Sequence, residues 1–278
     1  MTMTLTTACD ALATARRYCD QRCFAYHASW RFFRRTGLKG NPTWHTGFYR
    51  TALTNWSPST GRLRVLIAGA ADETVLVTLE RLVNRHRHRL EVHLIDTCPT
   101  PLHLARAHAH WSGLHLTERL DRAPQLATCV PPFDLILTDG LLSLLPTPGQ
   151  RAETITRLVQ LLADQGMLLY TTRVAGDAGV LEYDRLGRRI TAATALLTWP
   201  GPPHQRLRMA RSLRERPSRP APFTTAEEIT SSFASHFAHV RTYTRKAPHS
   251  LPLALAPSVR AGVGSTSVGV AATHGSAP

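Results

Sequence analysis

From Arg62 onward, short apolar runs typical of buried strands alternate with stretches of helical periodicity. The predicted strands are Leu63–Ala68, Leu90–Ile95, Leu114–Leu116, Phe133–Leu137 and Met167–Thr171. The predicted helices between them are Asp72–Arg85, Thr100–Trp111 and Gly149–Ala163. Strands separated by helices need crossover connections, which are right-handed and leave the strands parallel within one sheet. We therefore expect an α/β, Rossmann-like fold with a mostly parallel sheet flanked by helices.

The segments on either side of this core differ from it in composition. Residues 1–60 form the predicted N-terminal helical cap, with one helix over Asp10–Arg35. The core domain is predicted to span residues 61–247, ending in three helices and a sixth strand: Ala178–Leu197, Gln205–Arg216, Thr225–Phe237 and His239–Tyr243. Residues 248–278 are rich in Pro, Ala, Ser, Gly and Val without periodicity, which predicts a disordered tail.

The charge is strongly basic, with 33 Lys and Arg against 19 Asp and Glu and a net charge of +14. The excess lies in the flanking segments, whereas the core is nearly balanced. Because any basic chain attracts polyanions, this leaves nucleic acid or an acidic carrier protein open as a partner without selecting either. No apolar run reaches the roughly 18 residues of a membrane span, so we expect no membrane partner. The five scattered cysteines favour a reducing, cytoplasmic location.

Cys19, Cys23 and His27 suggest a metal site at first sight. On one straight helix, however, positions i and i+8 are about 12 Å apart, whereas zinc ligands lie about 2.0–2.3 Å from the ion. Both cysteines also fall on the apolar face of the predicted helix. We therefore expect core packing and no metal.

Polar residues follow the first two predicted strands, where ligands bind in open parallel sheets. Gly69 permits a tight turn after the first strand, and Asp96 ends the second strand with a carboxylate that can accept both hydroxyls of a ribose. A dinucleotide motif would need two further glycines, and the acidic Asp72 and Glu73 would repel a pyrophosphate. The turn therefore favours a positively charged ligand with a ribose and no phosphate, which describes S-adenosylmethionine.

Four stretches of the core resemble class I S-adenosylmethionine-dependent methyltransferases. They are Val65–Asp72, Val92–Asp96, Phe133–Thr138 and Leu161–Tyr170. The turn Ala68-Gly69-Ala70-Ala71-Asp72 resembles a variant branch with alanine in place of glycine. Ile67 stands where many members carry an acid, and Asp72 supplies a nearby carboxylate. The resemblance implies the fold, S-adenosylmethionine as cofactor and methyl transfer as the activity.

The resemblance also implies individual roles. Three residues of the first turn would line the methionine portion of the cofactor: Gly69, Ala70 and Ala71. Asp96 would hold the ribose hydroxyls, while Thr97 and Cys98 would lie at the edge of the adenine ring. Asp121 would contact the adenine amine, and Glu118 is the alternative residue for this contact. Thr138 and Asp139 would face the sulfonium and the substrate.

The aromatic segment Asn41–Tyr49 is a candidate lid over the open end of the sheet. In that role His45 and Tyr49 are candidate catalytic residues, with His45 as a base for a protonated acceptor. The alternative is that the segment packs the N-terminal helix onto the sheet. Methyl transfer depends chiefly on alignment of the acceptor with the methyl group, so no catalytic triad is required.

Three functions remain open. The first is methyl transfer to a small molecule, and the second is methylation of RNA or another nucleic acid through the basic flanks. The sequence lacks the Asn/Asp-Pro-Pro-aromatic motif of amino-methylating relatives, since Asp139-Gly140-Leu141-Leu142 stands there instead. The third is a non-catalytic binding protein on a degraded methyltransferase fold, which failure to bind the cofactor would reveal.

Overall fold

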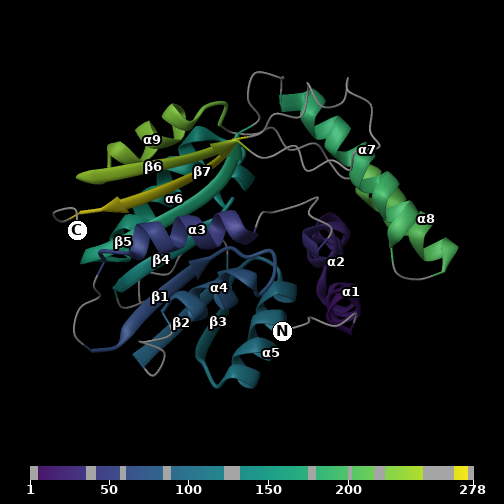
Figure 1. Ribbon diagram of the computed structural model, residues 1–278, viewed down its shortest axis with the longest axis horizontal. Helices are drawn as coiled ribbons and strands as arrows, with labels where there is room; N and C mark the ends of the chain where they lie inside the picture. Colours follow the sequence, from purple (N-terminus) through teal and green to yellow (C-terminus); the bar gives the residue numbers. More distant parts are fainter. Residues whose placement is uncertain are drawn as a thin grey trace.

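A seven-stranded sheet with the order β3-β2-β1-β4-β5-β7-β6 forms the centre of the protein (Figure 1). The computed structural model describes residues 6–35, 42–56, 61–83, 89–121, 132–174, 180–199, 202–215, 223–246 and 266–274. The strands are β1 (Leu63–Ala68), β2 (Leu90–Asp96), β3 (His115–Leu120), β4 (Phe133–Asp139), β5 (Leu162–Val174), β6 (His239–Lys246) and β7 (Thr266–Thr273). The first five are parallel, and β7 runs antiparallel to both β5 and β6. The predicted α/β fold is thus confirmed.

Helices cover both faces of this sheet. They are α1 (Thr6–Tyr18), α2 (Gln21–Arg35), α3 (Pro42–Leu53), α4 (Thr74–Leu82), α5 (Pro99–Ser112), α6 (Pro148–Gln160), α7 (Val180–Thr198), α8 (Pro203–Arg214) and α9 (Ala226–Ala234). One apolar core joins α3, α4 and α5 to one face, and a second joins α6 and α9 to the other. Alternate residues of β1 supply the two cores, because successive strand side chains point to opposite faces.

A third apolar cluster lies outside the sheet and joins α1, α2, α7 and α8. Trp199, Met209 and Leu213 are its larger buried members, and small alanines of α1 and α2 pack against them. Figure 1 shows α7 and α8 as a pair of helices that projects from the sheet, with α1 and α2 beside α5. Among the described residues, no helix is both long and apolar enough to cross a bilayer.

The prediction of a disordered tail over residues 248–278 is wrong for β7. Thr266–Thr273 pairs with β5 along one edge and with β6 along the other. Because helices cover both faces, every residue from Ser267 to Thr273 is buried and no polar alternation marks the strand. Its residues are small because α3 lies against it, with the Phe48 ring next to Gly269. The predicted domain boundary at residue 247 therefore excludes a strand of the sheet.

The prediction of one straight helix over Asp10–Arg35 is also wrong. The chain forms two helices, α1 ending at Tyr18 and α2 beginning at Gln21. Asp20 caps the second helix, because its Oδ1 accepts a hydrogen bond from the Cys23 N–H at 3.0 Å. This aspartate within a helical pattern was the available signal of a helix start. The break changes which side chains of the two helices meet.

The close packing of α3 on β7 can be tested by Gly269→Ala. An added Cβ would lie 2.8 Å from Phe48 Cδ2, so the ring must move, and we expect a loss of about 1–3 kcal/mol in the free energy of unfolding. The matched control is Gly47→Ala in α3, where nothing lies within 4 Å and alanine should stabilise the helix by about 0.5–1 kcal/mol. Urea unfolding measures both, and an equal effect of the two substitutions would contradict the contact.

Candidate functional site

The carboxyl ends of β1, β2, β3 and β4 form one edge of the sheet. Strand order reverses between β1 and β4, since β1 is followed in sequence by β2 on one side and lies beside β4 on the other. Ligands of open α/β sheets bind at such a point, outside the carboxyl ends of the strands. Ile67 lies opposite Leu137 in the β1–β4 register. Two residues further along, Gly69 begins the turn after β1 and Asp139 ends β4 beside it.

The turn after β1 depends on Gly69. Its φ of +77° lies in the left-handed region that glycine adopts at little cost. The Gly69 N–H donates to the Ile95 carbonyl oxygen at 2.8 Å, which ties the turn to the end of β2. A Cβ at this position would lie 3.3 Å from Leu141 Cδ1 in the loop after β4. The glycine therefore lets the loops after β1, β2 and β4 come together.

Asp96 links two of these loops through its carboxylate. Oδ2 accepts the Ala70 N–H at 2.8 Å, and Oδ1 accepts the Cys98 N–H at 2.7 Å. The residue is only 9% exposed. Burial raises the pKa of Asp96 above its usual range, although the two backbone donors oppose the shift. Each carboxylate oxygen can accept a second hydrogen bond, so the group can still hold a ligand hydroxyl.

The other residues around Asp96 differ in their exposure and partners. Asp72 is buried, and its Oδ1 accepts the Thr74 N–H at 2.9 Å at the start of α4. Thr97 is exposed beside Asp96. The Asp121 N–H donates to the Asp96 carbonyl oxygen at 2.9 Å, and its carboxylate pairs with Arg119 at 3.1 Å.

Glu118, the rival of Asp121, forms an ion pair with Arg106 of α5. That pair lies on the helix side of β3 rather than at the carboxyl edge. The structure therefore brings Asp121 rather than Glu118 to Asp96.

A second group of polar side chains lies at the end of β4. His45 Nε2 is 3.5 Å from Asp139 Oδ1, and the same oxygen accepts the Thr171 hydroxyl at 2.8 Å. The side chains of His45 and Asp139 are 17% and 26% exposed, so a ligand can reach both. Because α3 carries His45 and β4 carries Asp139, helix packing on the sheet creates this pair.

Two predicted site residues are buried in this structure. Tyr49 is 2% exposed and packs within the core beside Phe48, with the two ring centres 5.4 Å apart. Thr138 is completely buried within β4. The packing alternative for the aromatic segment therefore describes Trp44, Phe48 and Tyr49, whereas His45 on the same helix reaches the site.

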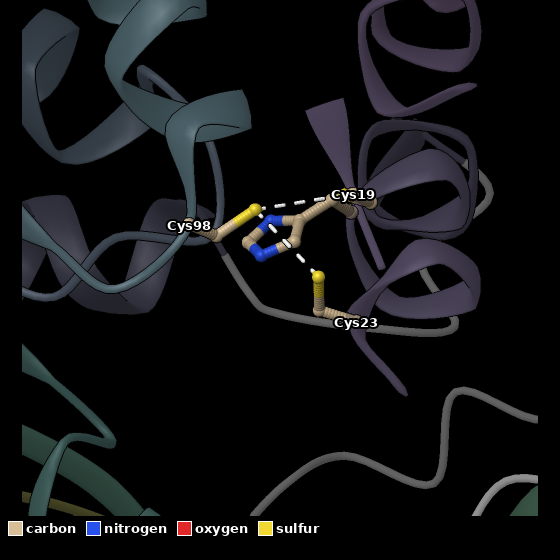
Figure 2. A group of neighbouring side chains, drawn as sticks. Cys19, Cys23 and Cys98 are labelled. Carbon is tan, nitrogen blue, oxygen red and sulfur yellow. Dashed lines mark hydrogen bonds between the residues drawn. The ribbon is translucent and has the colours of Figure 1, made fainter. Parts of the chain in front are cut away.

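Four residues lie together where the break between α1 and α2 meets the start of α5: Cys19, Cys23, His27 and Cys98. Their ligand atoms all lie within 4.8 Å of one another. We call them the Cys3His cluster. Figure 2 shows the three cysteine side chains converging: Cys98 comes from the segment before α5, Cys19 from the break between α1 and α2, and Cys23 from α2. Cys98 Sγ is 3.6 Å from both Cys19 Sγ and Cys23 Sγ. The prediction of no metal required Cys19, Cys23 and His27 to lie on one straight helix, whereas the chain breaks between α1 and α2.

The cysteines of this cluster differ in acidity. The hydrogen bond with Cys19 lowers the pKa of Cys98 to about 3, and His27 acts in the same direction. The same contact raises the pKa of Cys19, and burial raises that of Cys23 to about 12. The Cys98 thiol, which the family resemblance placed beside adenine, is thus directed into the cluster.

Comparison with known proteins bears on the fold. No protein-family model and no curated protein matches the sequence. Among solved structures, N-methyltransferase NodS from Bradyrhizobium japonicum WM9, in complex with S-adenosyl-L-homocysteine, matches with a TM-score of 0.50 and 15% identity over 95% of this chain and 98% of NodS. The chain has the class I methyltransferase fold.

Two further methyltransferases show the same likeness. One is phosphoethanolamine N-methyltransferase 2 from Haemonchus contortus, with a TM-score of 0.52 and 12% identity over 82% of this chain. The other is the CMeT domain of the citrinin polyketide synthase, with a TM-score of 0.51 and 13% identity over 84% of this chain. This chain spans 52% of each of those chains.

Proposed function

We propose that this protein transfers the methyl group of S-adenosylmethionine to a small-molecule acceptor. The observation that carries the proposal is the pairing of His45 with Asp139 at the carboxyl end of β4, on the strand next to the Gly69 turn. A proton acceptor thus stands at the edge of the sheet where a ligand binds. The methyltransferase fold supports the same activity.

The residues at this edge fit the proposed cofactor. S-adenosylmethionine supplies an already activated methyl group on a positively charged sulfur. Asp96 offers a buried carboxylate for the ribose hydroxyls, held in position by the Ala70 and Cys98 amides. Asp72 and Asp139 add negative charge at the ends of the neighbouring strands, which favours a cation and disfavours a pyrophosphate.

His45 is the proposed base. An acceptor that carries a proton at neutral pH must lose it during methyl transfer, and a neutral imidazole nitrogen can accept that proton. The carboxylate of Asp139 would stabilise the imidazolium that forms, and the Thr171 hydroxyl holds that carboxylate in place. Asp139 is therefore a positioning residue in this proposal, whereas His45 touches the acceptor.

A small acceptor agrees with the limited exposure of His45 and Asp139. Helix α3 carries His45 and packs on the sheet through Trp44 and Phe48, so only part of the imidazole is accessible. The Haemonchus enzyme is crystallised with phosphomonomethylethanolamine, a small molecule. The exposed arginines of α8 do not line this edge, and Arg211 pairs with Glu215 of its own helix turn at 2.8 Å.

Label transfer from S-adenosylmethionine with a radioactive methyl group tests the acceptor class. The protein would be incubated with the low-mass, protein and RNA fractions of a cell extract. We expect label in the low-mass fraction, with wild type and the surface variant His204→Ala and not with His45→Ala. Label confined to RNA, with binding that weakens steeply as salt rises, would contradict a small-molecule acceptor.

A further inference from the structure

The Cys3His cluster has the composition of a structural zinc site. Three thiols and one imidazole form a four-ligand set that leaves no position open for water or substrate. The ligands come from separate segments: Cys19 follows α1, Cys23 and His27 lie four residues apart on α2, and Cys98 precedes α5. None of these thiols is used in the proposed reaction.

The spacing of the sulfur atoms matches tetrahedral coordination. Zinc–sulfur bonds are about 2.3 Å long, so two thiolates on one tetrahedral ion lie about 3.8 Å apart. The two Sγ–Sγ distances from Cys98 are both 3.6 Å. A disulfide would instead require a distance of about 2.05 Å. The side chains are thus arranged around a common centre rather than paired in a covalent bond.

The hydrogen bonds around the cluster also have the form that metal ligands require. His27 Nδ1 lies 3.0 Å from the Ala71 carbonyl oxygen, and because a carbonyl only accepts, this nitrogen is the donor. In the neutral imidazole Nε2 then carries the lone pair, the form in which histidine binds zinc. The Thr100 hydroxyl lies 3.0 Å from Cys19 Sγ and can donate to a thiolate there. His27 is only 5% exposed and Cys98 is also buried, whereas Cys19 and Cys23 are partly exposed.

We propose that one Zn²⁺ binds at this cluster with four protein ligands: Cys19, Cys23, His27 and Cys98. The ion would fasten α1 and α2 to the loops after β1 and β2. His27 contacts the first loop through Ala71, and Cys98 belongs to the second loop, where its N–H holds Asp96. The site is therefore structural, and it orders the ribose-binding loop from the side of the N-terminal helices.

Metal binding does not depend on the proposed activity, whereas the effect on cofactor affinity rests on it. The first test is metal analysis of the full-length protein purified with zinc, followed by replacement with Co²⁺. We expect one zinc per chain, and for cobalt the visible bands of a tetrahedral ion together with a thiolate-to-metal charge-transfer band. Substoichiometric zinc, a cobalt spectrum without charge transfer, or recovery of a Cys19–Cys98 disulfide would overturn the site.

Substitution of single residues tests which side chains bind the proposed zinc ion. Cys23→Ser should lower zinc affinity at least tenfold and weaken the charge-transfer band, because a hydroxyl is a poor zinc ligand. His110→Ala, which replaces an exposed histidine of α5, is the matched control and should bind zinc like wild type. If Cys23→Ser does not fold, titration of chelator-treated wild type with Co²⁺ still decides the question. Equal zinc affinity in Cys23→Ser and wild type would contradict the ligand set.

Calorimetry of S-adenosyl-L-homocysteine binding with and without zinc tests whether the metal orders the ribose-binding loop. We expect removal of the metal to weaken binding at least tenfold, with recovery after zinc is restored. Unchanged affinity for S-adenosyl-L-homocysteine would show that zinc does not order this loop, while zinc binding itself would stand. No binding by the zinc-loaded protein would overturn the proposed cofactor instead, and the cobalt spectrum would still report on the metal site.

Discussion

His45→Ala should lower the rate of methyl transfer by about 10²- to 10⁴-fold, the usual contribution of a general base. Asp139→Asn should lower it less, because the imidazole remains and only its carboxylate partner at 3.5 Å is lost. Neither change should weaken cofactor binding at Asp96. Single-turnover rates with the acceptor found by label transfer measure both effects.

A matched control separates a base from a packing residue. His204→Ala replaces an exposed histidine of α8 and should leave the rate of methyl transfer unchanged. An equal loss of activity in His45→Ala and His204→Ala would contradict the assignment.

Removal of residues 247–278 should abolish folding. The deletion takes away β7, which joins β5 to β6 over eight residues on each side. Its two fully buried valines, Val268 and Val270, contribute about 3–6 kcal/mol through burial alone. Whole domains are stable by only about 5–15 kcal/mol. Solubility and circular dichroism of the truncated protein measure the effect.

The control is a chain that lacks only residues 275–278, which keeps the whole of β7. It should unfold at the same temperature as the full chain. A soluble, cooperatively folding protein without residues 247–278 would show that β7 is dispensable, as the composition of the segment suggested. Such a result would contradict the arrangement of the sheet.

Local patterns were enough to predict the strands that carry the cofactor site. The runs Leu63–Ala68 and Leu90–Ile95 are apolar and bounded by helical stretches, so strand, crossover and parallel pairing follow from the sequence. Gly69 and Asp96 then fall at carboxyl ends, and the structure does bring their loops together. These predictions succeeded because each depends on neighbours in sequence.

The features that sequence analysis missed depend on contacts between distant segments. Cys98 meets Cys19 and Cys23 across 79 and 75 residues, and no spacing rule predicts that approach. His45 reaches Asp139 only because α3 packs on the sheet. β7 resembles a linker in composition because α3 packs against it and leaves room only for small residues such as Gly269.

Calorimetry of S-adenosyl-L-homocysteine binding to wild type and Asp96→Asn tests whether the Asp96 carboxylate holds the cofactor. Loss of hydrogen bonds to a charged carboxylate should weaken binding about 10- to 100-fold. The matched control is Asp134→Asn, whose carboxylate also accepts a backbone N–H at 2.8 Å but lies at the opposite end of β4. We expect tight binding by wild type and Asp134→Asn and weak binding by Asp96→Asn. Absence of binding to wild type, or an equal loss in both variants, would contradict this expectation.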